Sequence, residues 1–267
     1  MAKIAFIGAG RMASAIVAGL LRHRVAAPEQ IICTSAADNT GPELAEKTGI
    51  GYTESLDELF GDADTVVLAC KPQQLGQLPD NVAELGRKRL IISILAGTPI
   101  AKLQSVFPTA RNIVRAMPNT PGQIGAGITA YAASSELDHE DDQMVKSILD
   151  ALGETVTVTE DQIDAVTGVS GSGPAYVFEF VAALRDAGVA AGLDAELSYR
   201  LALQTVRGAG ELLNVVPETP ETHRNWVSSP GGTTLAGLAV MEQAGFRELM
   251  KRTVLAAKHR AEELAQG

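Results

Sequence analysis

The first twenty residues place a short apolar run directly before an amphipathic segment. The run from Ile4 to Ile7 is typical of a buried strand. Met12, Ile16 and Leu20 then recur every four residues, which predicts a helix with one apolar face. The chain is therefore expected to begin with a strand, a tight turn and a helix.

The same alternation continues to about residue 158. Strand-like apolar runs occur at 30–34, 64–70, 90–95, 111–116, 128–131 and 155–158. The segments between them have helical spacing, including a stretch over 141–152 and the apolar positions Leu75, Leu78, Val82 and Leu85. Alternating strands and helices predict an α/β fold with a Rossmann-type doubly wound sheet.

Near Glu160 the strand-like runs stop, and Ala- and Leu-rich helical segments continue to the end. Pro174 suits the first turn of a helix, because its missing N–H would have no helical partner there. That helix is expected to bury Val177, Phe180, Val181 and Leu184. A second helix is expected over 195–213. These helices are too apolar for so small a domain to cover, which predicts that they dimerise. We expect a doubly wound domain over 1–160 and an all-helical domain over 161–267.

Composition narrows the class of protein. With 46% hydrophobic and 20% charged residues over 267 positions, the chain has the make-up of an ordinary globular protein. A net charge of −10 disfavours nucleic acid or an anionic membrane as partners, because both attract basic faces. No run approaches about 18 consecutive apolar residues, so no transmembrane helix is expected. The early first strand leaves no room for a signal peptide.

The cysteines and histidines suggest a reducing cytoplasm and no metal site. Cys33 and Cys70 lie at the ends of predicted strands among apolar neighbours, which favours small buried thiols over a disulfide. The histidines are scattered, without the pairing with cysteine that is typical of metal ligands; they are His23, His139, His223 and His259.

Gly8, Gly10 and Ala13 form a G-x-G-x-x-A pattern between the first strand and the first helix. Gly8 permits the tight turn, Gly10 lets a pyrophosphate approach the backbone, and Ala13 lets helix and strand pack closely. The helix N-terminus offers unpaired N–H groups and the positive end of its dipole to phosphate groups. This context predicts a dinucleotide-binding site; the alternative is a flexible glycine turn between two core elements.

The end of the second strand bears on which dinucleotide binds. Folds specific for NAD place an acidic residue near this point to hold the ribose 2′-hydroxyl. Here Thr34 and Ser35 end the strand, and no carboxylate follows until Asp38. An uncharged strand end leaves room for a 2′-phosphate, which favours NADPH and keeps NADH as the alternative. Arg11 is the candidate counter-charge, or else a solvated surface arginine.

Three further loops follow strand ends, where open α/β sheets bind their ligands. One strand leads directly into Lys71 and Pro72, and the next ends at Ala96 and Gly97, where a small or missing side chain allows close approach. The following strand leads into a rigid loop between two prolines, which carries Asn119. Asn119 could hydrogen-bond the nicotinamide, its ribose or a substrate, or could simply form the turn.

A second glycine loop, Ser229-Pro-Gly-Gly-Thr-Thr234, precedes a helix with apolar residues at Leu235, Leu238 and Met241. Backbone N–H groups at a helix N-terminus, uncovered by side chains at the glycines, form an anion site. Three hydroxyl side chains surround it without an adjacent Lys or Arg, which suits a carboxylate better than a phosphate. The alternative is an ordinary Ser/Thr helix cap.

Five motifs follow one another along the chain: Gly8-Ala-Gly-Arg-Met-Ala13, Ala69-Cys-Lys-Pro72, Arg115-Ala-Met-Pro-Asn-Thr-Pro121, Gly171-Ser-Gly-Pro-Ala-Tyr176 and Ser229-Pro-Gly-Gly-Thr-Thr234. With them the chain closely resembles the pyrroline-5-carboxylate reductase family from Lys3 to Glu263. The glycine fingerprint fits many families, whereas the third and fifth motifs at this separation are far more specific. The resemblance implies reduction of the cyclic imine of L-1-pyrroline-5-carboxylate to L-proline with NADPH or NADH, the last step of proline biosynthesis.

The resemblance also implies roles for single residues. Thr234 would hydrogen-bond the imine nitrogen as proton donor or relay. The substrate carboxylate would lie against Ser229, Gly231, Gly232 and Thr233. Cofactor contacts would fall on Gly8, Gly10, Arg11, Met12, Lys71, Pro72, Ala96, Gly97 and Asn119, to which the uncharged strand end adds Ser35. The family implies a dimer with interleaved C-terminal helices, often assembled into decamers.

Two other functions are open. A reductase acting on a 2-oxo or 3-hydroxy acid would share the first domain, but it would bring a lysine or histidine general acid in the helical domain, and no comparable motif occurs. A non-catalytic nucleotide-binding protein would show a degraded second glycine loop, whereas the loop from Ser229 to Thr234 is intact. The missing general-acid motif and the intact second loop therefore both favour the imine reductase.

Overall fold

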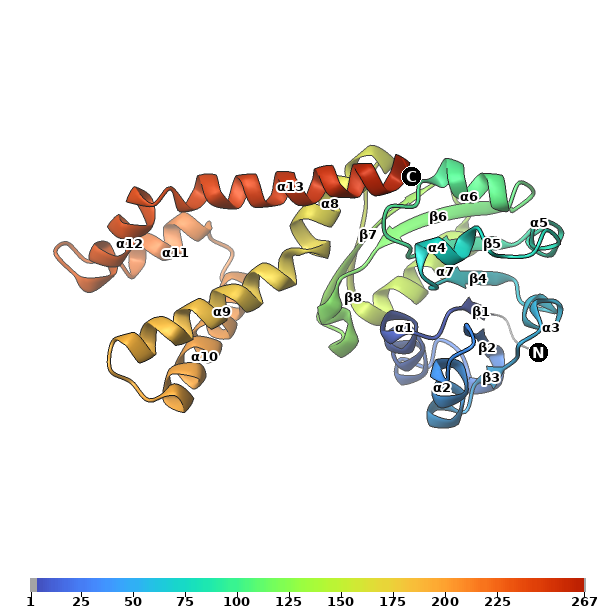
Figure 1. Cartoon of the computed structure of the whole chain (residues 1–267), viewed down its shortest axis with the longest axis horizontal. Helices are drawn as coiled ribbons and strands as arrows, with labels where there is room; N and C mark the ends of the chain where they lie inside the picture. Colours follow the sequence, from blue (N-terminus) through green and yellow to red (C-terminus); the bar gives the residue numbers. More distant parts are fainter. Residues whose placement is uncertain (1–3, 267) are drawn as a thin grey trace. The chain divides into compact units, whose positions relative to one another are not determined.

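Eight strands form one sheet in the computed structural model, which describes residues 4–266. They lie in the order β3-β2-β1-β4-β5-β6-β7-β8 (Figure 1). Their bounds are β1 Ile4–Ile7, β2 Ile31–Thr34, β3 Gly51–Tyr52, β4 Thr65–Leu68, β5 Leu90–Ser93, β6 Asn112–Met117, β7 Gly127–Ala133 and β8 Gly153–Thr157.

The direction of the sheet order reverses at β1. Ile4 of β1 pairs in register with Ile31 of β2 on one side and with Thr65 of β4 on the other, and both pairings are parallel. In doubly wound sheets, ligands bind at this reversal, outside the carboxyl ends of the strands. The predicted fold class, a Rossmann-type doubly wound sheet followed by a helical region, is confirmed.

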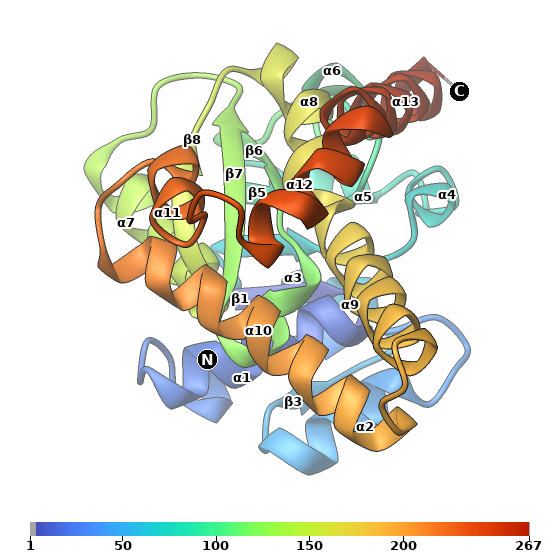
Figure 2. The same ribbon diagram turned by 90° about the vertical axis from the view of Figure 1, so that its left-hand side faces the viewer.

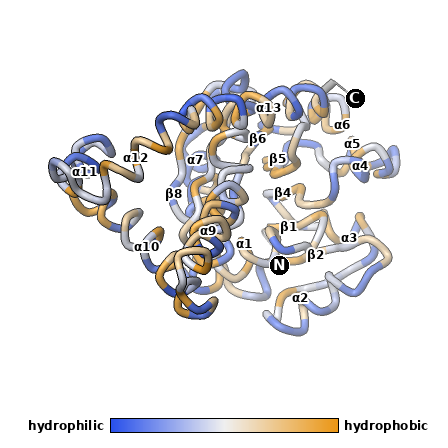
Figure 3. The backbone as a smooth tube through the Cα atoms, turned by 60° about the vertical axis from the view of Figure 1, so that its left-hand side comes forward, coloured by the Kyte–Doolittle hydropathy of each residue, from blue (hydrophilic) through white to orange (hydrophobic). Residues whose placement is uncertain are grey.

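Helices cover both faces of the sheet. Those that accompany the strands are α1 Arg11–Arg22, α2 Thr40–Thr48, α3 Leu56–Phe60, α4 Pro72–Leu75, α5 Val82–Leu85, α6 Ile100–Val106, α7 His139–Leu149 and α8 Ile163–Val166. One buried cluster joins α1, α2 and α7 to alternate strand residues such as Phe6, and the other joins α3 to α6 to the intervening residues such as Ile7. Burial on both faces explains why β1, β4 and β5 are hydrophobic along their length (Figure 3).

One local prediction was wrong, and the direction of one strand was not predicted. The helical spacing from Leu75 to Leu85 suggested one stretch, but the chain forms two short helices, α4 and α5, because Gly76 and Pro79 interrupt it. The strand β7 was expected, but not its direction: it runs antiparallel to β6, with Arg115 paired to Ala132. A short connection suffices between antiparallel strands, whereas a parallel pair needs a longer crossover.

The helical region forms α9 Gly173–Ala190, α10 Ala195–Val215, α11 Pro220–Trp226 and α12 Thr233–Gln243, and α13 spans Phe246–Gln266. Figure 2 shows α9 and α10 joined by a short turn. They approach closely where Gly188 of α9 faces Ser198 of α10, since a Cβ atom on Gly188 would collide with the Ser198 hydroxyl. That hydroxyl donates to the Arg185 carbonyl at 2.5 Å.

The single chain does not bury the apolar side chains of α9 that were expected to be buried. Val177, Phe180 and Leu184 are 46%, 43% and 38% exposed, and Val181 is only half-buried. Hydrophobic side chains are also exposed on α10 and α12, for example Leu203 and Val240. Exposed apolar side chains on several helices agree with the predicted self-association of these helices.

The chain divides into two compact units, one of residues 4–172 with 255–266 and one of residues 173–254. The last turns of α13 therefore belong to the unit that holds the sheet. Within the described residues, no helix combines the length and hydrophobicity needed to cross a membrane.

Candidate cofactor and substrate sites

Gly8 lies where β1 ends, and the fold itself requires it. Its φ of +108° is outside the range that other residues adopt readily. A Cβ atom would lie 2.5 Å from the backbone of both Ala69 and Cys70, directly after β4. The Gly8 N–H donates to the Thr34 carbonyl at 2.9 Å, which links the turn to β2 as well. Gly8, at the end of β1, therefore packs closely against the ends of β2 and β4.

Gly10 is different, because no atom of residues 4–266 occupies the space beside it. Its φ of −70° is open to any residue, and a Cβ atom would meet no atom within 4 Å. Gly10 is also the N-cap of α1, where no side chain accepts a hydrogen bond and no acidic residue stands in the first turn. The free N–H groups, the open space and the exposed Arg11 fit a dinucleotide pyrophosphate.

A cavity of about 470 Å³ starts at this N-terminus and continues between α1 and α2. Gly10, Arg11 and Ser14 line it from one side, and Thr40 and Lys47 are among the residues that line it from the other. Arg11 and Lys47 bring to the cavity the positive charge that a phosphate-bearing ligand prefers, and Glu43, which also lines it, partly offsets that charge. The glycine loop thus opens onto a ligand-sized space.

The loop after β2 carries no free carboxylate directly at the strand end. Ser35 is held within the loop: its hydroxyl accepts from the Gly41 N–H at 3.2 Å and donates to the Ala36 carbonyl at 3.1 Å. Asp38 accepts from both the N–H and the hydroxyl of Thr40, at 3.0 and 2.6 Å. These bonds from Thr40, with a smaller contribution from the charge of Lys71, lower the pKa of Asp38.

The loops after β4 and β5 begin as the sequence predicted. Lys71 is exposed at the N-terminus of α4, and Pro72 is the first residue of that helix. Ala96 is exposed, and Gly97 has a φ of +64°. A Cβ atom on Gly97 would lie 2.8 Å from Leu264 Cβ in α13. The missing side chain of Gly97 therefore makes room for a helix, a packing reason that the sequence did not suggest.

One end of the Asn119 side chain takes part in the turn, and the other end is free to bind a ligand. Its Oδ1 atom accepts from the Ile128 N–H at 3.0 Å, which ties the loop after β6 to the start of β7. Among the described residues, its Nδ2 group donates to no partner. The turn-forming role is thus present, and one donor stays available to a ligand.

The second glycine loop leaves the N-terminus of α12 uncapped. Gly232 is the N-cap, and no side chain accepts a hydrogen bond there. Its N–H donates to the Ser229 carbonyl at 2.9 Å, and Gly231 has a φ of +72° that only glycine adopts readily. Within the part of the chain described, the hydroxyls of Ser229, Thr233 and Thr234 make no hydrogen bond to protein. The Ser/Thr cap considered as the alternative does not form.

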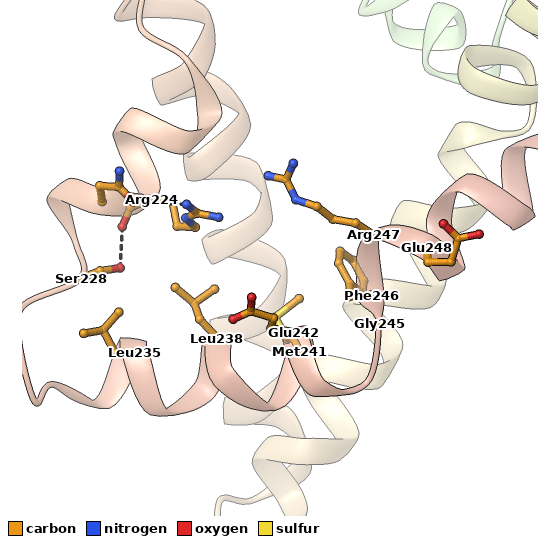
Figure 4. A pocket seen from close by; sticks show the side chains of 11 residues that line it. Arg224, Ser228, Leu235, Leu238, Met241, Glu242, Gly245, Phe246, Arg247 and Glu248 are labelled. Carbon is orange, nitrogen blue, oxygen red and sulfur yellow. Dashed lines mark hydrogen bonds between the residues drawn. The ribbon is translucent and has the colours of Figure 1, made fainter.

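A pocket that the sequence did not indicate lies beside this loop in the same unit. It has a volume of about 550 Å³ between α11, α12 and the start of α13 (Figure 4). Leu235, Leu238 and Phe246 give it apolar walls, and Arg224 and Glu248 are among its charged residues. It adjoins the predicted loop through Leu235 but contains none of the predicted substrate residues.

Fold and sites together define an oxidoreductase with a dinucleotide-binding domain and a helical association domain. The model of the family "NADP oxidoreductase coenzyme F420-dependent" matches residues 3–97, and that of "Pyrroline-5-carboxylate reductase dimerisation" matches residues 160–264. Within that class, the chain belongs to the pyrroline-5-carboxylate reductase family.

Relatives match the chain over its whole length. The pyrroline-5-carboxylate reductase of Synechocystis sp. is 41% identical over 264 residues, which is 99% of this chain and 98% of the relative. The structure of a pyrroline-5-carboxylate reductase from Coxiella burnetii has a TM-score of 0.91 at 36% identity, covering 99% and 98% of the two chains. The Plasmodium falciparum pyrroline carboxylate reductase, solved with NADP bound, has a TM-score of 0.86 at 31% identity, with the same coverage.

Proposed function

We propose that this chain reduces the cyclic imine of L-1-pyrroline-5-carboxylate to L-proline with NADPH, the last step of proline biosynthesis. The observation that carries the proposal is the uncapped N-terminus of α12, where two glycines leave the backbone uncovered and three hydroxyls have no hydrogen-bond partner among the described residues. It occurs in a chain whose α1 has a second such N-terminus at the glycine loop. One site suits a small carboxylate and the other a dinucleotide.

The reaction needs orientation and one proton. The reduced nicotinamide, when bound, would supply the hydride that forms the new C–H bond at the imine carbon. The C=N π electrons move to nitrogen, which takes up one proton to give the neutral secondary amine of proline; a second proton, from water, gives the ammonium form. The protein must therefore hold the carbon in line for transfer and keep the nitrogen hydrogen-bonded.

The loop before α12 holds the substrate carboxylate in this proposal. Ser229 and Thr233 supply hydroxyl donors, and Gly231 exposes its backbone N–H. The N–H of Gly232 is taken by the Ser229 carbonyl, but the missing side chain of Gly232 leaves the N–H groups of the first turn of α12 uncovered. No Lys or Arg is part of the loop, so the carboxylate binds through hydrogen bonds and the dipole of α12.

Thr234 is the proposed proton donor or relay. Its side chain is half-buried in the first turn of α12 and makes no hydrogen bond among the described residues. A hydroxyl can both donate and accept, so it can pass a proton to the imine nitrogen without being a strong acid. A protonated imine needs no further acid for hydride attack.

The cofactor lies along the carboxyl edge of the sheet in this proposal. The pyrophosphate binds at the start of α1, through Gly8, Gly10, Arg11 and Met12. The remaining contacts come from the other strand ends: Ser35, Lys71, Pro72, Ala96, Gly97 and Asn119. We favour NADPH because Ser35 is uncharged and because one Asp38 oxygen is engaged by Thr40. Residues 1–160 bind the dinucleotide, and residues 161–267 bind substrate and dimerise.

We further propose that the protein works as a homodimer in the cytoplasm and that its dimers assemble into decamers. The exposed apolar side chains of α9 and α12 support the dimer. Sedimentation of the purified protein distinguishes monomer, dimer and decamer.

The proposed function is tested by mixing the protein with L-1-pyrroline-5-carboxylate and either NADPH or NADH. We expect loss of the nicotinamide absorbance together with formation of proline, faster with NADPH. Oxidation of neither cofactor, although NADPH binds in a titration, would leave the dinucleotide site in place and reject the assignment of the second loop.

A further inference from the structure

A buried arginine links two strand ends to a segment that follows the sheet. Arg115 is in β6, only 4% exposed, and pairs in register with Ser93 at the end of β5. Its guanidinium donates to Asp164 of α8 at 2.6 Å and to Glu160 at 3.5 Å. An arginine so deeply buried requires carboxylate partners, because an unpaired buried charge is strongly destabilising.

Glu160 has a second partner at the beginning of α6. Its Oε1 atom, which faces Arg115, also accepts from the backbone N–H of Ile100 at 2.6 Å. Ile100 is the first residue of α6, and the N-cap residue Pro99 supplies no side-chain acceptor. Glu160 therefore caps α6 from 60 residues away in sequence, and its charge suits the positive end of the helix dipole.

The loop between β5 and α6 is held from another side as well. Gly97 packs against Leu264 at the end of α13, and Figure 1 shows this end of α13 beside α6. A similar contact lies after β6, where a Cβ atom on Gly171 would come 2.5 Å from Met117 Cε. Gly171 ends a π-helical turn that follows α8, and such turns occur frequently at functional sites.

We infer that Glu160 and Arg115 are positioning residues for the cofactor. By its hydrogen bond to Ile100, Glu160 fixes the position of the loop of residues 96–99. By its ion pair with Arg115, it fixes the position of that loop relative to the end of β6, which leads to Asn119. Both loops carry residues assigned above to the cofactor, so the inference rests on the proposed function. Neither Glu160 nor Arg115 is proposed to contact the cofactor itself.

Three substitutions at Glu160 distinguish the effect of its hydrogen bond to the start of α6 from the effect of its negative charge. Glu160→Ala removes both, Glu160→Asp keeps the charge but shortens the reach to Ile100, and Glu160→Gln keeps an oxygen that can accept from Ile100. Asp138→Ala is the matched control: Asp138 caps α7 by accepting from the Asp141 N–H at 2.8 Å. Because β7 is antiparallel, that cap lies at the opposite edge of the sheet.

The measurements are NADPH binding by nicotinamide fluorescence, hydrogen exchange of the Ile100 amide, and the melting temperature. For Glu160→Ala we expect faster exchange at Ile100 and a dissociation constant for NADPH raised on the order of tenfold, since a misplaced binding group loses orientation. Glu160→Asp is expected to weaken binding in the same direction, and Glu160→Gln to restore it to within about twofold of the parent. Asp138→Ala is expected to lower the melting temperature and leave NADPH binding unchanged.

Unchanged NADPH binding in Glu160→Ala, despite faster exchange at Ile100, would overturn the inference. If Glu160→Ala does not fold, NADPH binding and exchange of the Ile100 amide are compared in Glu160→Asp instead, and the same outcome would overturn the inference. Equal weakening in Asp138→Ala would show a general effect of stability and would also overturn it. Binding is measured without substrate, so a parent protein that binds NADPH but forms no proline contradicts the proposed function alone. A parent that does not bind NADPH contradicts both.

Discussion

Substitution of Gly10 by alanine tests whether the space beside the glycine loop belongs to a ligand. An added methyl group at Gly10 meets no atom of the described residues within 4 Å, and the φ of −70° suits alanine. The free energy of unfolding is therefore expected to change by less than about 1 kcal/mol, because alanine restricts the unfolded chain but is a poorer N-cap residue than glycine. If a pyrophosphate lies there, the methyl group intrudes on it.

The size of the expected binding defect follows from the cost of overpacking. Inserting a methyl group into a filled site costs about 1–3 kcal/mol. Since about 1.4 kcal/mol corresponds to a tenfold change in affinity, the dissociation constant for NADPH should rise roughly 5- to 150-fold. The assay is a fluorescence titration with NADPH, paired with thermal unfolding of the same samples.

Gly8→Ala is the contrasting variant. Here the methyl group would lie 2.5 Å from the backbone of Ala69 and Cys70, at a φ of +108°. A left-handed conformation costs roughly 1–2 kcal/mol for a residue with a side chain, and overpacking adds about 1–3 kcal/mol. Gly8→Ala should therefore lose both stability and NADPH affinity. If Gly10→Ala binds NADPH as tightly as the parent, the space at Gly10 is not the pyrophosphate site and the reasoning fails.

Three further predictions concern the second loop and an ion pair. Thr234→Ala should lower turnover on the order of 100-fold with little change in NADPH affinity, as steady-state kinetics and titration will show; turnover within about twofold of the parent would remove Thr234 from proton transfer. Gly232→Ala places a methyl group 2.6 Å from the Ser229 hydroxyl, so it should raise the KM for the substrate, and an unchanged KM would contradict the carboxylate site. Hydrogen bonds from Arg111 lower the pKa of Asp64, so this pair stabilises the folded protein above about pH 4 and loses that effect as the pH falls through the lowered pKa. At neutral pH, Asp64→Asn should accordingly lower the free energy of unfolding by less than about 1 kcal/mol, and its melting temperature should be below that of the parent. In acid the two melting temperatures should approach each other; a difference that persists in acid would argue against the ion pair.

The sequence predicted the features that depend on local pattern. Apolar runs located β1 and β4 because a strand covered on both faces has few polar positions. The glycine loop and the start of α12 were recognisable because a turn, a helix N-terminus and small residues are specified within a few positions. Each of these elements is determined by its immediate neighbours in the chain.

Features that depend on distant residues were not predictable in the same way. Nothing near Gly97 in sequence indicates that Leu264 packs against it. The direction of β7 depends on the length and path of its connection, which periodicity does not encode. The sequence does contain one signal of a distant contact: Arg115 interrupts an apolar strand, and a charge at a core position requires partners elsewhere in the chain.

The most direct test of hydride transfer to the imine uses NADPH that carries deuterium at both C4 positions of the nicotinamide. The protein is supplied with this cofactor and L-1-pyrroline-5-carboxylate, and the product is analysed by mass spectrometry. The account predicts proline that contains deuterium at C5, the former imine carbon. Proline without deuterium, or no proline from protein that binds the cofactor, would contradict it.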